Sequence, residues 1–136
     1  MSVIAFIERA GLLLLERRSD APVWGLIAGR VDDETVAEAL RREVYEETGL
    51  AVTSQRPFGV FSDPTRIVSY RDGNVFSVVS FVYSVDVETF EGLRPSSESE
   101  ELRFFERDEL LDLDLPATQR HIIEQYISGA TPPVLE

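Results

Sequence analysis

The segment Asp32–Leu50, DDETVAEALRREVYEETGL, constrains the fold more than any other part of the chain. Its apolar residues recur at the spacing of one face of a helix, at Val36, Leu40 and Val44. Asp32 or Asp33 can cap the first turn, and Gly49 stands where a helix commonly ends. We therefore predict an amphipathic helix over this segment.

Three carboxylates share one face of this predicted helix. Glu43, Glu46 and Glu47 stand at positions i, i+3 and i+4, and each such like-charged pair destabilises a helix by about 0.2–0.5 kcal/mol. Their charge also lies near the negative end of the helix dipole. A divalent cation would offset this repulsion, and hard carboxylate oxygens suit Mg²⁺ or Mn²⁺. The pattern favours a metal site on the helix.

The same residues carry a resemblance to a known family. The run Arg42–Leu50, REVYEETGL, matches the second half of the Nudix box, G-x5-E-x7-R-E-U-x-E-E-x-G-U with U apolar, and Glu34 lies at the right distance before Arg42. Upstream, only four residues separate Gly29 from Glu34, where the pattern has five. The chain thus resembles MutT-like Nudix hydrolases with a first loop one residue shorter.

This resemblance implies an α/β architecture, the Nudix fold, in which a mixed β-sheet is sandwiched between helices in a single domain spanning residues 1–136. It also implies hydrolysis of a nucleoside diphosphate linked to another moiety, with Mg²⁺ or Mn²⁺ as cofactor. Metal activation of a water that attacks phosphorus is the expected chemistry.

The resemblance also implies roles for particular residues. Metal ligands are expected at Glu43, Glu46 and Glu47, at the backbone carbonyl near Ala28, and at Glu101, with Glu98 as the rival of Glu101. The general base is open between Glu43, Glu101 and Glu98, because spacing does not decide which carboxylate faces the water. Arg42 is expected to orient the carboxylates by pairing with Glu46 or Glu34.

Candidate substrate-binding residues lie outside the motif. An aromatic ring can stack on a base and a guanidinium can grip a phosphate, and the candidates are Arg30, Phe61, Arg66, Tyr70 and Arg71. For any one of Phe61, Arg66, Tyr70 and Arg71, a role in surface or edge packing is more common than a role in substrate binding. We expect His121, far from the acidic motif, to be a surface or structural residue.

A nucleoside triphosphate, normal or oxidised, is the favoured substrate, and ADP-ribose or a nucleotide sugar is the alternative. A nucleotide sensor without catalytic activity is the alternative from another class.

The strand pattern agrees with an α/β fold. Strands are expected at Ser2–Glu8, Leu12–Arg18, Trp24–Ile27, Ala51–Phe61, Ile67–Arg71, Val75–Val87 and Leu102–Glu106. A hairpin turn is expected at Asp72-Gly73-Asn74. Helical segments are expected at Asp108–Leu111 and Thr118–Ser128, followed by a frayed tail that contains Pro132-Pro133.

Composition narrows the chemistry. The formal net charge of −12 argues against extensive nucleic-acid binding, which needs many basic contacts to phosphates, but leaves a small phosphorylated nucleotide possible. The chain has no cysteine, and all 13 of its basic side chains are arginine, so thiol and lysine nucleophiles are excluded. No apolar run suits a signal peptide or a membrane span, so we expect a cytoplasmic protein without membrane association. A homodimer is plausible from the resemblance.

Overall fold

The computed structural model describes residues 1–69 and 72–136 of the chain. The strands are β1 (Ser2–Arg9), β2 (Leu12–Arg18), β3 (Trp24–Arg30), β4 (Val52–Phe61), β5 (Ile67–Ser69), β6 (Val75–Ser77), β7 (Ser80–Val87), β8 (Ser99–Phe105) and β9 (Val134–Leu135). The helices are α1 (Val36–Thr48), α2 (Arg107–Leu110) and α3 (Ala117–Ser128). The predicted order of strands and helices is confirmed, except where noted below.

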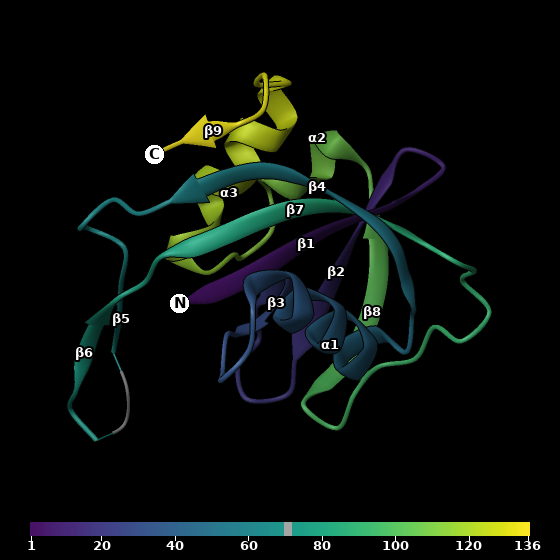
Figure 1. Cartoon of the computed structure of the whole chain (residues 1–136), viewed down its shortest axis with the longest axis horizontal. Helices are drawn as coiled ribbons and strands as arrows, with labels where there is room; N and C mark the ends of the chain where they lie inside the picture. Colours follow the sequence, from purple (N-terminus) through teal and green to yellow (C-terminus); the bar gives the residue numbers. More distant parts are fainter. Residues whose placement is uncertain (70–71) are drawn as a thin grey trace.

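The main sheet is mixed, with the strand order β8-β2-β3-β1-β7-β4-β9 (Figure 1). β1 runs antiparallel to β3 but parallel to β7, and Ile4 lies between Ala28 on one side and Val82 on the other. β2 is paired on both sides, by β3 and β8, which agrees with its run of apolar residues. Because β2 and β3 run antiparallel, the end of β2 at Arg17 lies opposite the start of β3 at Trp24, and the end of β3 pairs with the start of β1.

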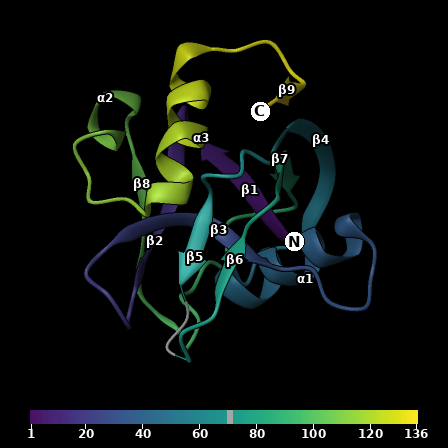
Figure 2. The same cartoon turned by 90° about the vertical axis from the view of Figure 1, so that its left-hand side faces the viewer.

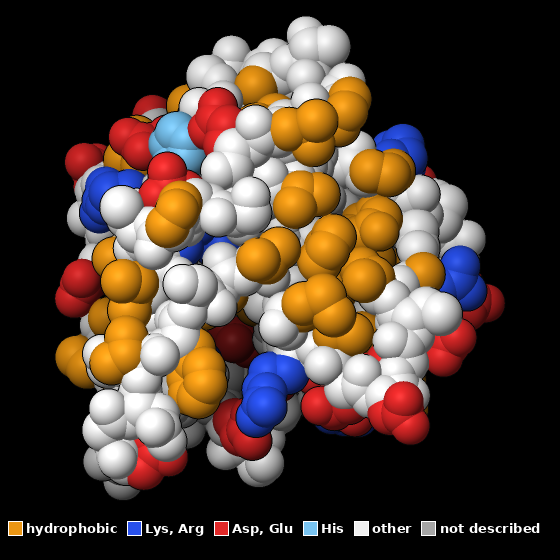
Figure 3. Space-filling model, turned by 60° about the vertical axis from the view of Figure 1, so that its left-hand side comes forward, with side chains coloured by type: hydrophobic (Ala, Val, Ile, Leu, Met, Phe, Trp, Pro, Cys, Tyr) orange, Lys and Arg blue, Asp and Glu red, His pale blue; other side chains and the backbone are white. Residues whose placement is uncertain are grey.

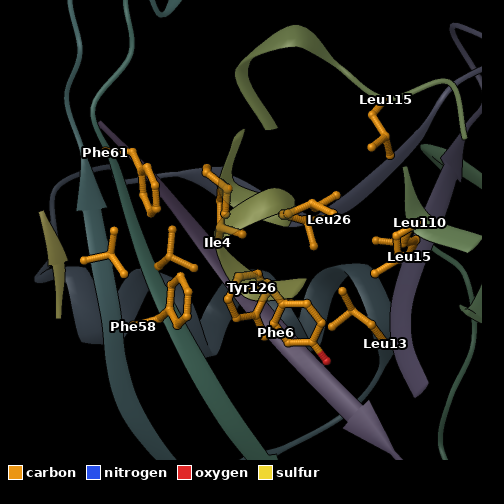
Figure 4. Packing of buried hydrophobic residues seen from close by; sticks show 14 of the residues in the cluster. Ile4, Phe6, Leu13, Leu15, Leu26, Phe58, Phe61, Leu110, Leu115 and Tyr126 are labelled. Carbon is orange, nitrogen blue, oxygen red and sulfur yellow. The ribbon is translucent and has the colours of Figure 1, made fainter. Parts of the chain in front are cut away.

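Both faces of the sheet are buried, because alternate residues of β1 enter two different cores. Ile4 and Phe6 pack with residues of α3, and the Phe6 ring lies 4.7 Å from the Tyr126 ring and 4.8 Å from the Phe58 ring (Figure 4). The intervening residues of β1 pack with α1 in the second core, which contains Val3, Ala5, Ile7, Leu14, Ile27, Ala39, Leu40 and Val44. The predicted sheet between helices is therefore confirmed.

Helix α1 begins later than the sequence analysis predicts. The N-cap is Thr35, whose Oγ1 accepts a hydrogen bond from the Glu38 amide at 3.1 Å, so the prediction of Asp32 or Asp33 as the cap is wrong. A threonine hydroxyl three residues before a glutamate is a common start signal. The preceding residues form a loop that carries Glu34 to Arg42. The end is as predicted, with Gly49 in the left-handed conformation at φ 76°.

Two other predictions about the strands are wrong. The segment predicted as one strand, Val75–Val87, is two strands separated at residues 78–79, where the chain passes from the β5–β6 hairpin into the main sheet. The tail is not frayed, because β9 pairs in parallel with β4. The predicted hairpin turn is present, with Gly73 at φ 87° and the Asp72 carboxylate accepting the Asn74 amide at 2.9 Å. Tyr70 and Arg71 lie outside the described residues.

The β5–β6 hairpin extends away from the main sheet (Figures 1 and 2). Large hydrophobic side chains of the hairpin are about half exposed, namely those of Ile67, Val75 and Phe76. Hydrophobic side chains also gather elsewhere on the face of the molecule shown in Figure 3. Within the described residues, no helix is both long enough and apolar enough to cross a membrane.

Arg66 connects the base of the β5–β6 hairpin to the rest of the molecule by hydrogen bonds. Its Nη1 donates hydrogen bonds to the carbonyl oxygens of Phe61 at 2.8 Å and Val78 at 2.7 Å. Its Nη2 donates to the Ser80 hydroxyl at 3.1 Å and to the Thr118 carbonyl at 2.8 Å. One guanidinium thus joins the end of β4, the start of β7 and the first turn of α3.

This arrangement predicts a large stability difference between two arginine substitutions. Arg66→Ala leaves several part-buried carbonyls without a donor, so the free energy of unfolding should fall by about 2–3 kcal/mol. Arg56→Ala is the matched control: it removes one exposed ion pair with Asp86 and should cost less than about 1 kcal/mol. Urea denaturation measures both, and equal effects would contradict this role of Arg66.

Candidate active site

Arg42 lies at the centre of an ion-pair network on α1. Its guanidinium donates to both carboxylate oxygens of Glu34, at 3.0 and 3.1 Å from Nε. Nη1 donates to Glu43 at 2.9 Å and to Glu46 at 3.2 Å, and Nη2 donates to the Arg30 carbonyl at 3.0 Å. The predicted pairing with Glu34 and Glu46 is confirmed. The Arg42 guanidinium lowers the pKa of the Glu34 carboxyl, so Glu34 is held ionised.

An acidic cavity of about 370 Å³ opens beside this network, between α1, the ends of β2 and β3, and the loop before β8. Its lining residues are Glu16, Arg18, Ala28, Gly29, Arg30, Asp32, Glu43, Glu47 and Glu98. The structure therefore brings together five candidates from the sequence, namely Ala28, Arg30, Glu43, Glu47 and Glu98. Glu46 is absent from the lining, and its side chain is 53% exposed.

Glu47 is the most buried carboxylate of α1, and a second carboxylate lies against it. Glu47 is 9% exposed and Glu16, on β2, is 6% exposed. Burial and the neighbouring Glu47 raise the pKa of the Glu16 carboxyl to about 9. Glu47 Oε2 accepts a hydrogen bond from the Ser96 hydroxyl at 3.2 Å, whereas Glu16 Oε2 is buried without a hydrogen-bond partner in the described part of the chain.

Gly29 is required by the close approach of Glu43. A Cβ on residue 29 would lie 1.9 Å from the carboxyl carbon of Glu43 and 2.3 Å from its Cγ, so no other residue fits while Glu43 stays in place. Burial raises the pKa of the Glu43 carboxyl, although its bond to Arg42 acts in the opposite direction. The strand end and the helix thus hold this carboxylate at the wall of the cavity.

The sequence analysis did not identify Glu16 or Arg18. Leu14 packs against α1, and Glu16, two residues on, points to the same face. A carboxylate on the inward face of a buried strand was the signal that could have identified Glu16. Arg18 pairs with Asp20, at 2.9 Å from Nε, and lies at the wall of the cavity, where a guanidinium can meet a phosphate.

The loop before β8 places Glu98, not Glu101, at the acidic cavity. Glu101 lies within β8, opposite Arg17, and its carboxylate pairs with Arg103 at 2.8 Å. The strand directs it away from the cavity lining, so the geometry does not support Glu101 as a ligand or base. Glu98, the rival considered in the sequence analysis, lines the cavity.

The other predicted substrate-binding residues lie elsewhere. Phe61 is 1% exposed and Arg66 is occupied by its four acceptors, and both line a separate cavity of about 300 Å³. Tyr70 is outside the described residues. His121 lines the same separate cavity and pairs with Glu136, which raises the pKa of the imidazole. These contacts agree with the prediction that His121 is a surface or structural residue.

The acidic cavity offers the donors that a hard divalent cation uses. Carboxylates of Glu16, Glu43 and Glu47 and the backbone near Ala28 supply oxygen, and Glu16 Oε2 lacks a partner. Among the described residues, no three acidic or histidine side chains already converge as a chelating group. Arg42 holds Glu43 and Glu46 to one side, so a cation here would be held by fewer carboxylates together with water or substrate oxygens.

Comparisons with known proteins identify the family of the chain. The NUDIX domain family matches residues 1–126. The chain is 34% identical over 131 residues to an ADP-ribose pyrophosphatase of Methanocaldococcus jannaschii, covering 93% of this chain and 72% of that protein. It is 31% identical over 127 residues to the nucleoside triphosphatase NudI of Enterobacter sp., covering 87% of this chain and 89% of that protein.

Solved structures show the same fold. The E. coli ORF135 protein superposes with a TM-score of 0.75 at 26% identity, covering 98% of this chain and 92% of that one. The NUDIX domain of Shewanella oneidensis NrtR, solved with ADP ribose, has a TM-score of 0.73 at 19% identity, covering 96% of this chain and 87% of that one. The α/β architecture predicted from the sequence is therefore the Nudix fold, and the chain belongs to the NUDIX domain family.

Proposed function

We propose that this chain is a single Nudix domain that hydrolyses the pyrophosphate bond of a nucleoside triphosphate, normal or oxidised, with Mg²⁺ or Mn²⁺. The observation that carries the proposal is the acidic cavity beside the Arg42 network, with two buried carboxylates in its lining. The relative named a nucleoside triphosphatase, 89% of which this chain covers, supports this substrate class. ADP-ribose or a nucleotide sugar is the second candidate, favoured by the relative named an ADP-ribose pyrophosphatase.

Glu47 and the backbone carbonyl near Ala28 would hold the cation, and Glu46 would reach it through water from the rim. Glu43, which the sequence also suggests as a ligand, would instead act on the water, because Arg42 already binds its Oε1 atom. Bound there, a divalent cation neutralises phosphate charge and lowers the pKa of a water molecule. Glu43 is our choice of general base, because it is fixed at the cavity wall by Gly29 and Arg42. Glu98 is the alternative base, since it lines the same cavity.

With the cation bound, each proton and bond of the reaction can be assigned to a named group. Glu43 takes a proton from the water while the water oxygen attacks phosphorus, and the bridging oxygen leaves with the second phosphorylated product. Arg18 and Arg30 line the cavity and would contact the phosphate oxygens. Arg42 acts as a positioning residue, because its hydrogen bonds go to carboxylates and a carbonyl. The homodimer and the cytoplasmic location stay predictions.

The direct test is a substrate panel with magnesium, with manganese and with a chelator. Nucleoside triphosphates, oxidised nucleotides, ADP-ribose and nucleotide sugars are compared by release of pyrophosphate or phosphorylated products. We expect chelator-sensitive cleavage, with triphosphates turned over fastest. Fastest cleavage of ADP-ribose would replace the first substrate class by the second. No cleavage of any compound by a protein that still binds manganese would contradict the hydrolase and favour a sensor.

The two adjacent glutamates of the motif should differ in effect. Glu47→Gln removes a buried carboxylate from the cavity and should lower metal-dependent turnover by at least about 100-fold. Glu46→Gln removes a half-exposed carboxylate paired with Arg42 and should cost on the order of tenfold. Neither change should lower the melting temperature without metal, because each relieves repulsion. Unchanged turnover in both variants would refute the metal site.

Gly29→Ala tests the placement of Glu43. The new Cβ must displace the Glu43 carboxylate, and a shift of about 1 Å at a reacting group can cost on the order of 100-fold in rate. Gly25→Ala on the same strand is the matched control, because its Cβ would meet only the flexible end of Gln119, at 3.2 Å. Turnover that falls equally in both variants would show that Gly29 has no specific role.

A further inference from the structure

Among the described residues that line the acidic cavity, Glu16 is the one titratable residue that lies on a strand and is itself buried. It follows Leu13, Leu14 and Leu15, each of which is at most 1% exposed, and it is itself 6% exposed. Its backbone is held in register between Gly25 of β3 and Leu102 of β8. The side chain therefore has little freedom to move out to solvent.

The surroundings of this carboxylate leave one oxygen unsatisfied. Glu16 Oε2 has no hydrogen-bond partner in the described part of the chain, although Glu16 lines a cavity. Buried polar atoms of native proteins are almost always hydrogen-bonded or bound to an ion. The nearest acidic neighbour, Glu47, cannot relieve Glu16 when both are ionised. Arg18 lines the same cavity, but its guanidinium makes two hydrogen bonds to Asp20.

We propose that Glu16 is a further ligand of the divalent cation, supplied by β2 from outside the Nudix motif. The inference rests on the proposed metal-dependent function. The cation would lie between Glu16 on the sheet and Glu47 on the helix, and it would satisfy the free Oε2 atom and offset the repulsion between the two carboxylates. Because these ligands belong to different elements, bound metal would also tie α1 to β2.

A purely structural role makes a different prediction. If Glu16 were a neutral acid that only donates a hydrogen bond to Glu47, glutamine would replace it, since its amide donates from nearly the same position. A metal ligand needs the negative charge, and affinity of such sites depends on the number of charged oxygens. Glu16→Gln therefore separates a ligand from a positioning residue.

The experiment measures Mn²⁺ binding to the full chain without substrate, by the loss of the free-ion signal in electron paramagnetic resonance. Melting temperatures with and without Mn²⁺ are recorded in parallel. Glu16→Gln should weaken binding by at least about tenfold and remove most of the Mn²⁺-dependent rise in melting temperature. Glu47→Gln should do the same. Glu38→Gln, an exposed position at the start of α1, is the control and should bind as the unmodified chain does.

Each outcome decides between the roles. Wild-type affinity in Glu16→Gln, with affinity lost in Glu47→Gln, would overturn the role of Glu16 and leave the proposed function intact. Absence of saturable binding by the unmodified chain would overturn the proposed function as well. If Glu16→Gln does not fold, Glu16→Met keeps the test available: it removes the buried unpaired oxygen, so it should fold without metal and still show the loss of affinity.

Discussion

The hydrogen bonds of Arg42 are the interaction on which the geometry of the site depends. A single guanidinium faces Glu34, Glu43 and Glu46 and also binds the backbone carbonyl of Arg30. An isolated exposed ion pair contributes little to stability, but a network around a planar, five-donor group fixes orientations. The loop after β3 and the helix α1 are therefore held together, with three motif carboxylates turned toward the Arg42 guanidinium.

This arrangement leaves negative charge uncompensated at Glu47, one turn after Glu43 on the same face of the helix. Arg42 offsets the carboxylates that it touches, whereas Glu47 faces Glu16 across the cavity with no direct cationic partner among the hydrogen bonds and ion pairs of either carboxylate in the described residues. Buried like charges are costly unless a cation or a proton joins them. The protein therefore holds an excess of buried oxygen donors beside the arginines Arg18 and Arg30, which suits a metal-bound phosphate.

The sequence was sufficient for some of these features because they depend on local spacing. The helical period placed Glu43, Glu46 and Glu47 on one face, and Gly49 marked the helix end. The loop is one residue short of the family pattern, and Glu34 still reaches Arg42 with both oxygens.

Other features depend on tertiary contacts that spacing does not encode. Glu16 belongs to a strand whose sequence pattern indicates only that it is buried. That Glu16 faces the acidic carboxylates becomes evident only when α1 is packed on that face of the sheet. Glu98 and Glu101 are equally acidic, and the start of β8 decides which one meets the cavity. Val78 and Val79 favour a strand locally, yet the chain leaves one sheet and enters another there. From the sequence, Arg66 is a candidate to bind a substrate phosphate. In the structure its guanidinium donates hydrogen bonds to backbone carbonyl oxygens instead.

The most direct test of the account is the position of the cation. Crystals grown with Mn²⁺ and measured for anomalous scattering would show where the ion binds. We predict a peak inside the acidic cavity, at bonding distance from oxygens of Glu47 and Glu16 and near the carbonyl of Ala28. A peak held at the exposed rim by Glu46 or at Glu101, with the cavity empty of manganese, would contradict the account.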